Sequence, residues 1–143
     1  MGKIFSICNQ KGGVGKTTTA VNVAACLSES GRKVLLIDMD PQGNATSGLG
    51  IDKNGIEKTV YDLITENITH TEILLDTGFT NLKLIPANAS LTGAEVELIG
   101  VDRREYLLSD KLEKIKNEFD FILIDCPPSL GLLTLNALAG SDG

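Results

Sequence analysis

The sequence is poor in cysteine and histidine, the residues that build disulfide frameworks and many metal sites. Its 143 residues include three cysteines and one histidine. Cys8, Cys26 and Cys126 form no C-x-x-C pair, and their odd number argues against a disulfide framework. We therefore expect reduced structural thiols in a cytoplasmic protein and no metal cluster. The single histidine, His70, lies in a polar stretch and is expected to face solvent.

The chain also lacks a net positive charge and a long hydrophobic run. Its formal net charge is −6 and its pI is about 4.7, so no global basic field attracts nucleic acid or acidic lipid. No apolar run approaches the roughly 18 residues that a membrane span requires, so we expect no stable span. The basic residues form no convincing stripe for DNA; they include Arg32, Lys33, Arg103, Arg104, Lys111, Lys114 and Lys116.

What remains is an alternation of apolar runs and helical patterns within one domain, residues 1–143. Four runs predict strands: residues 3–8, 33–39, 82–86 and 121–124. Helical segments are expected at residues 16–30, 60–64, 73–75, 94–99, 104–117 and 129–139, with a loop at 41–55 that holds at most short helical turns. The pattern predicts an α/β fold, a doubly wound and mostly parallel sheet with helices on both faces.

A glycine-rich stretch, NQKGGVGKTTT at residues 9–19, stands between the first predicted strand and the first predicted helix. That order is the one a phosphate-binding loop requires. Gly12, Gly13 and Gly15 allow successive backbone N–H groups to point at a phosphate. The start of the helix adds unsatisfied N–H groups and the positive end of its dipole. The stretch therefore predicts a site for a nucleoside triphosphate.

Two side chains of this stretch carry specific chemistry. Lys16 supplies a charge for the β- and γ-phosphates, and the Thr17 hydroxyl can take a place on Mg²⁺. The predicted nucleotide-binding residues are Lys11, Gly12, Gly13, Val14, Gly15, Lys16, Thr17 and Thr18.

The match to G-x-x-x-x-G-K-[ST] is imperfect in an informative way. Gln10 occupies the position of the first glycine, and a second lysine, Lys11, follows it. Because Lys16 already serves its own site, Lys11 is expected to serve the phosphates of a neighbouring subunit. KGGVGKTT with this early lysine is the signature of the deviant Walker-A ATPases. The sequence closely resembles the ParA/Soj chromosome- and plasmid-partitioning ATPases, whose relatives include MinD and the nitrogenase iron protein.

Three aspartates follow apolar strands and complete the predicted site. Asp125 ends the run FILID in the Walker-B form, where a carboxylate at the carboxyl end of a parallel strand can hold the Mg²⁺ shell through water. Asp38 and Asp40 end the second strand, in the sequence IDMDPQGN. If the strand continues to Asp40, both carboxylates point the same way; otherwise Asp40 merely opens a loop. In the family, the aspartate that matches Asp40 positions the attacking water, and the one that matches Asp38 lies near the Mg²⁺ site.

The resemblance implies slow ATP hydrolysis that acts as a switch, with Lys11, Lys16 and Asp40 as the catalytic residues and Thr17, Asp38 and Asp125 around the metal. It implies an ATP-dependent homodimer, non-specific DNA binding, a ParB-type partner, and a cytoplasmic protein that associates with the nucleoid in its ATP state. The chain matches the N-terminal part of the family, so an apolar sheet edge is expected to be exposed, and the DNA-contacting residues are expected outside this sequence. The alternatives are a MinD-like membrane-cycling ATPase and a truncated nucleotide-binding module without turnover.

Overall fold

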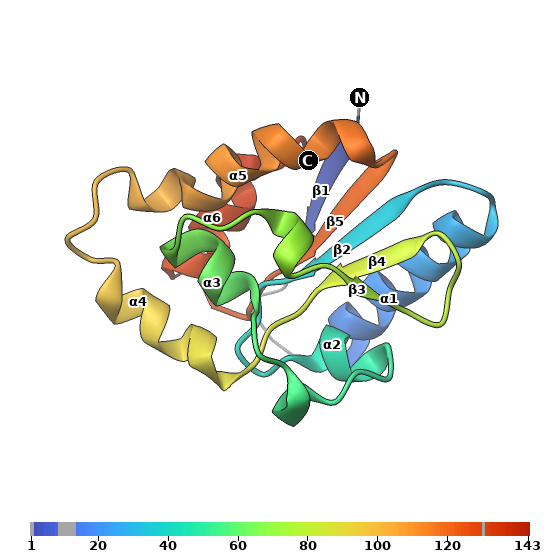
Figure 1. The fold of residues 1–143 in the computed structure, drawn as a ribbon, viewed down its shortest axis with the longest axis horizontal. Coiled ribbons are helices and arrows are strands. Elements are labelled where there is room, and N and C mark those ends of the chain that lie inside the picture. Colours follow the sequence, from blue (N-terminus) through green and yellow to red (C-terminus); the bar gives the residue numbers. More distant parts are fainter. Residues whose placement is uncertain (1, 9–13, 130) are drawn as a thin grey trace.

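A computed structural model describes residues 2–8, 14–129 and 131–143. Within these residues the chain forms a five-stranded sheet in the order β1-β5-β2-β4-β3 (Figure 1). Neighbours among β1, β5, β2 and β4 are parallel, and β3 is antiparallel to β4. The strands are β1 (Lys3–Ile7), β2 (Val34–Asp38), β3 (Leu75–Asp76), β4 (Leu82–Ile85) and β5 (Phe121–Asp125).

Helices cover both faces of this sheet (Figure 1). One face carries α1 and α2, and the other carries α3, α5 and α6. Short 3-10 turns at Lys53–Gly55, His70–Glu72, Ala89–Gly93, Arg104–Tyr106 and Lys116–Glu118 join or extend them. The helices are α1 (Val14–Glu29), α2 (Asn44–Gly48), α3 (Val60–Thr65), α4 (Ala94–Glu97), α5 (Leu107–Ile115) and α6 (Leu132–Gly140). The predicted α/β fold is therefore confirmed.

Strand β2 shows why the sequence forms a sheet that is covered on both sides. All five of its residues are buried, as expected for a central parallel strand. Successive side chains alternate between the faces: Leu35 and Ile37 pack in the core beneath α3, α5 and α6, and Val34 and Leu36 pack beneath α1. The continuous apolar run is thus shared between two cores.

Three local predictions need correction. The segment 73–75 is not a helix, because Leu75 and Asp76 form β3 against the edge of β4; a short apolar run does not distinguish a helix from a strand. The helix predicted at 104–117 is α5 with a 3-10 turn at each end. His70 is not solvent-exposed: its side chain is only 12% accessible, and its Nε2 lies 2.7 Å from Glu118 Oε2.

The backbone of Asp142 and Gly143 forms hydrogen bonds with the outer edge of β1. The backbone of Asp142 donates to Ile4 O at 2.6 Å, and Ser6 N donates to Gly143 O at 2.8 Å. Phe5, Leu135 and Leu138 remain exposed. Part of this edge is thus paired, while several apolar side chains stay accessible to solvent.

The side chain of Glu95, in α4, forms hydrogen bonds with the backbone at the start of α6. Its carboxylate accepts the N–H groups of Leu132 at 2.9 Å and Leu133 at 3.3 Å. These are among the unpaired N–H groups of the first helical turn, where negative charge is favourable. We expect Glu95→Ala to lower the free energy of unfolding by about 1 kcal/mol, a typical value for the loss of a helix cap. Urea unfolding measures the effect, with the exposed Glu57→Ala as the control; equal stability of the two variants would refute this role.

Candidate functional site

The predicted site residues that the structure describes gather where parallel strands end and α1 begins. In the register of β2 and β5, Asp38 lies opposite Asp125, so two carboxylates occupy the same edge of the sheet. Helix α1 starts at Val14, next to that edge, and brings Lys16 and Thr17 in its first turn. The carboxyl edge of an open parallel sheet is the usual place for a ligand.

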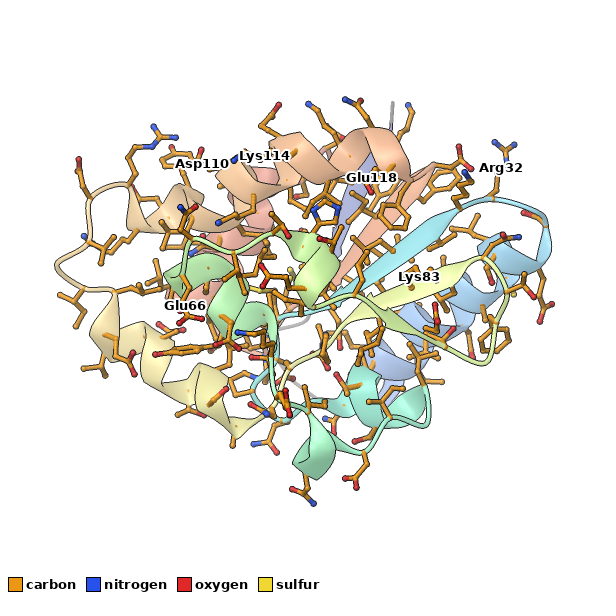
Figure 2. The ribbon with its side chains drawn as sticks, viewed as in Figure 1. Arg32, Glu66, Lys83, Asp110, Lys114 and Glu118 are labelled. Carbon is orange, nitrogen blue, oxygen red and sulfur yellow. The ribbon has the colours of Figure 1, made fainter. Side chains whose placement is uncertain are left out.

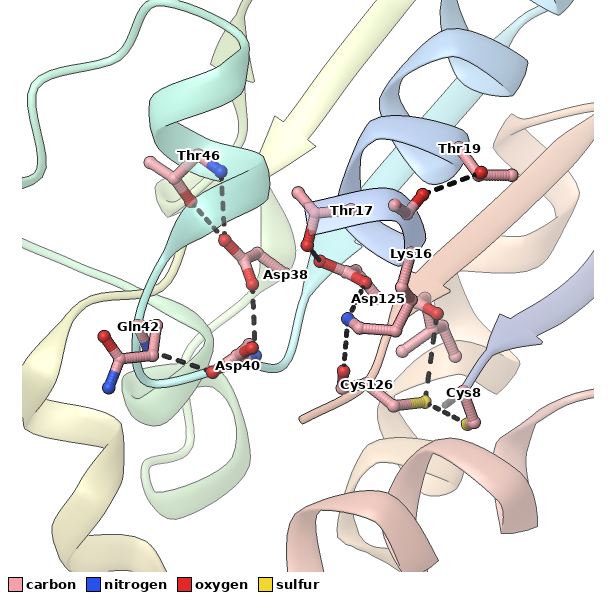
Figure 3. A network of polar contacts seen from close by, with 12 residues as sticks. Cys8, Lys16, Thr17, Thr19, Asp38, Asp40, Gln42, Thr46, Asp125 and Cys126 are labelled. Atoms are coloured by element: carbon pink, nitrogen blue, oxygen red, sulfur yellow. Dashed lines mark hydrogen bonds and ion pairs between the residues drawn. The ribbon is translucent and has the colours of Figure 1, made fainter. Parts of the chain in front are cut away.

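Lys16 and Asp125 form the centre of the polar network in Figure 3. The Lys16 ammonium makes an ion pair with Asp125 Oδ1 and donates to Cys126 O at 2.6 Å. Thr17 Oγ1 donates to Asp125 Oδ2 at 3.2 Å. All three side chains are buried. A buried cation, a hydroxyl and a carboxylate are thus held together by contacts between residues more than a hundred positions apart.

The charge state of Asp125 depends on this network. Burial raises the pKa of Asp125 above its usual value, and the hydrogen bond and charge of Lys16 act in the opposite direction. Lys16 is therefore the contact that favours the carboxylate form.

A cavity of about 610 Å³ opens beside these residues, within the usual range of about 300–1,000 Å³ for ligand sites. It runs between the first turns of α1 and the segment that follows β2. Its lining comprises Lys16, Thr17, Thr18, Val21, Asn22, Asp40, Gln42, Asn44, Gly48 and Pro128.

Asp40 faces this cavity although β2 ends two residues earlier, at Asp38. Asp40 is 4% exposed, and its Oδ1 accepts the N–H of Gln42 at 3.0 Å. The turn then relies on Gly43, whose φ of 64° lies in the left-handed region. A Cβ at this position would lie 2.8 Å from Ala87 O, so both the conformation and the space call for glycine.

Asp38 holds the segment after β2 in place. Its Oδ1 accepts the N–H of Asp40 at 3.0 Å, and its Oδ2 accepts the N–H and hydroxyl of Thr46 at 3.0 and 2.8 Å. Thr46 Oγ1 in turn accepts the N–H of Ala87 at 3.1 Å. In this structure Asp38 therefore positions Asp40, and its place near a metal stays a prediction. Sequence reasoning missed Thr46, because only the packing of α2 against β2 brings the threonine to Asp38.

The stability of the ligand-free chain is expected to depend on the charge of Asp38. Burial, opposed by the hydrogen bonds from Thr46 and Asp40, raises the pKa of Asp38 from 3.8 to about 7. Between these values the unfolded chain loses the proton while the folded chain keeps it, so this contribution is complete below pH 4 and is lost as the pH rises through 7. Its upper size is about 4 kcal/mol, at about 1.4 kcal/mol per pKa unit.

Urea unfolding from pH 4 to pH 7 tests this expectation. Asp38→Asn keeps a neutral side chain throughout, so the stability of the native chain relative to this variant should fall as the pH rises. A difference that is constant over this range would contradict the raised pKa.

Several predicted site residues are only partly described. Lys11, Gly12 and Gly13 lie outside the described residues, and of Val14 only the backbone is described. Gly15 is exposed and faces open space, and Thr18 lines the cavity. The list of nucleotide-binding residues therefore stays a prediction.

The sequence and the fold of this chain are similar to those of known proteins. A model of the AAA domain family matches residues 2–143. The chain belongs to this family. Within it, the Sporulation initiation inhibitor protein Soj of Bacillus subtilis is 56% identical over 142 residues, covering 99% of this chain and 56% of the relative. The Chromosome partitioning protein ParA of Myxococcus xanthus is 55% identical over 142 residues, covering 99% and 50%. The ParA/Soj resemblance seen in KGGVGKTT is confirmed.

A solved structure supports the fold of this family member. Cobyrinic acid a,c-diamide synthase from Mycobacterium smegmatis, with a bound ATP analogue and magnesium, superposes with a TM-score of 0.94 at 42% identity. The match covers 99% of this chain and 57% of that one. The chain spans about half the length of the curated relatives and of this structure.

The positions of basic side chains bear on contacts with DNA, and the lengths of the helices bear on contacts with membranes. The labelled basic residues in Figure 2, Arg32, Lys83 and Lys114, lie apart from one another, on the turn after α1, on β4 and on α5. Among the described residues, no helix combines the length and apolar character needed to cross a bilayer.

Proposed function

We propose that this chain carries the ATP site of a ParA/Soj-type partitioning ATPase. The observation that carries the proposal is the meeting of Lys16, Thr17 and Asp125 at the start of α1, beside the cavity that Asp40 lines. The Soj and ParA relatives, at 56% and 55% identity, favour partitioning over other uses of the same fold.

The residues present fit a nucleoside triphosphate and Mg²⁺. The Thr17 hydroxyl and the Asp125 carboxylate are adjacent oxygen donors, which Mg²⁺ prefers, and Mg²⁺ keeps several of its waters in such sites. When bound, Mg²⁺ neutralises negative charge on the phosphate oxygens. Lys16 and the free N–H groups of α1 bind the β- and γ-phosphates.

Asp40 accounts for hydrolysis in this proposal. Its buried carboxylate faces the cavity and is held by Gln42 N and, through the backbone, by Asp38. It orients the water that attacks the γ-phosphate, and the products are ADP and phosphate. As the ParA/Soj resemblance implies, the bound nucleotide acts as a switch and ATP is hydrolysed slowly.

The remaining steps concern the whole protein. ATP bound between two subunits forms a homodimer, in which Lys11 of each copy reaches the phosphates of the other. The dimer binds DNA non-specifically and associates with the nucleoid of the cytoplasm, and a ParB-type partner stimulates hydrolysis and resets the cycle. The net charge of −6 of this chain means that the DNA contact requires a local basic surface.

Calorimetric titration with Mg-ATP, followed by size-exclusion chromatography with light scattering in Mg-ATP and Mg-ADP, tests the proposal. We expect saturable ATP binding and a dimer only with ATP. Absence of ATP binding by the folded chain would refute the ATP site. ATP binding without a dimer or turnover would favour a nucleotide-binding module instead.

Pelleting with DNA and with anionic liposomes, both in Mg-ATP, separates partitioning from the MinD-like alternative. The full-length protein is the sample for this comparison. Co-sedimentation with DNA alone supports partitioning, and co-sedimentation with liposomes alone supports membrane cycling.

A further inference from the structure

Two cysteines that are distant in sequence meet beside the candidate nucleotide site. Cys8 follows β1 and Cys126 follows β5, and Cys8 Sγ lies 2.6 Å from Cys126 Sγ (Figure 3). The strands that carry them are neighbours, with Ile7 opposite Asp125. The ladder continues for one more bond, from Cys126 N to Ile7 O at 3.1 Å. The contact is therefore fixed by the sheet itself.

The backbone geometry at this point suits a disulfide. Neighbouring strands lie about 4.7–4.9 Å apart in the hydrogen-bonding direction. Disulfides join Cα atoms that are about 4.4–6.8 Å apart. Because Cys8 and Cys126 follow paired residues of adjacent strands, a covalent bond between their sulfur atoms requires no large movement of the chain.

The two thiols differ in access to solvent. Cys8 is exposed, whereas Cys126 is fully buried. A soluble oxidant therefore meets Cys8 first, and Cys126 is placed to resolve the product.

We propose that Cys8 and Cys126 are a reversible disulfide-forming pair, oxidised by a low-molecular-weight disulfide such as glutathione disulfide. The Cys8 thiolate attacks one sulfur of glutathione disulfide, which gives a mixed disulfide and releases one glutathione thiolate. The Cys126 sulfur then attacks Cys8 Sγ and displaces the second glutathione, whose thiolate takes up the proton that Cys126 loses. The two cysteines are oxidised by two electrons, and one glutathione disulfide is reduced to two glutathione molecules.

The pair is positioned to act on the nucleotide site. Cys126 O accepts a hydrogen bond from Lys16, and Asp125 immediately precedes Cys126. Cys8 immediately precedes the glycine-rich stretch 9–19. A disulfide links Cys8, which precedes that stretch, to Cys126, whose carbonyl oxygen accepts from Lys16. We therefore expect oxidation to weaken ATP binding. This consequence rests on the proposed ATP site, whereas formation of the disulfide does not.

Thiol counting and peptide mapping test the disulfide directly. After treatment of the folded chain with glutathione disulfide, we expect loss of two of the three free thiols to an internal bond, and dithiothreitol should restore them. The mapped peptides should link Cys8 to Cys126. Cys26→Ser is the matched control and should form the same link, because Cys26 is an exposed thiol on α1. Cys8→Ser should form none.

Two results would overturn the proposal. One is a stable glutathione adduct on Cys8 with Cys126 still reduced. The other is no reaction at either residue while Cys26 is modified.

ATP titrations of the oxidised and reduced chain test the consequence separately. We expect about tenfold weaker ATP binding after oxidation, with recovery in dithiothreitol and no change in Cys8→Ser; a tenfold change corresponds to about 1.4 kcal/mol. Equal affinity of both forms would overturn the link to the nucleotide site. Failure of the reduced chain to bind ATP would refute the proposed function and leave the disulfide result intact.

Discussion

Replacing Lys16 with alanine is expected to weaken ATP binding by about 100-fold or more. A hydrogen bond to a charged group contributes about 1.5–3 kcal/mol, and each 1.4 kcal/mol is a factor of ten. The structure adds a second cause. Lys16 is also the ion-pair partner of Asp125, so its removal leaves the buried Asp125 without the cation that favours its carboxylate form, the form proposed to hold Mg²⁺. Calorimetric titration with Mg-ATP measures the loss.

The same substitution is expected to destabilise the ligand-free chain, because breaking a buried ion pair costs about 3–5 kcal/mol. Circular dichroism therefore has to show that the variant is folded, and Lys16→Gln, which keeps more of the side chain, serves as a second test. Lys83→Ala is the matched control, since Lys83 pairs with Asp76 on the surface, where such pairs contribute about 0–1 kcal/mol. Native ATP affinity in a folded Lys16→Ala chain would remove Lys16 from the site.

Replacing Asp40 with asparagine is expected to lower ATP turnover by about 100-fold or more while ATP binding is retained. A side chain that positions or deprotonates the reacting group typically contributes about 10²–10⁴-fold to the rate. Asparagine can still accept the N–H of Gln42, so the turn after β2 should keep its shape. Release of phosphate at saturating Mg-ATP measures the effect. The ATP dimer should persist in Asp40→Asn and in Asp40→Ala.

Asp52→Asn is a close control for this substitution. Asp52 also accepts the N–H two residues further on, Asn54 N at 3.0 Å, but it is exposed. The Asp52→Asn variant should therefore hydrolyse ATP at the native rate. Full activity in Asp40→Asn would show that the water is oriented by another group.

Local order in the chain was predictable from short-range patterns. The apolar runs that became the central strands β2 and β5 are continuous because both faces of the sheet are covered there, and this feature is visible in the sequence. The strand–glycine–helix order around Lys16 is likewise a property of adjacent residues. The short strand β3 was missed because Leu75 and Asp76 are extended only through their pairing with β4.

The sequence by itself determined the fold class, the place of the phosphate-binding stretch, and the acids that end β2 and β5. Tertiary structure alone decided three further features: that Asp38 accepts from Thr46 and thereby positions Asp40, that His70 lies next to Glu118, and that Cys8 meets Cys126. The reason is physical. Periodicity and turn chemistry depend on neighbours along the chain, whereas these contacts depend on which strands and helices lie side by side.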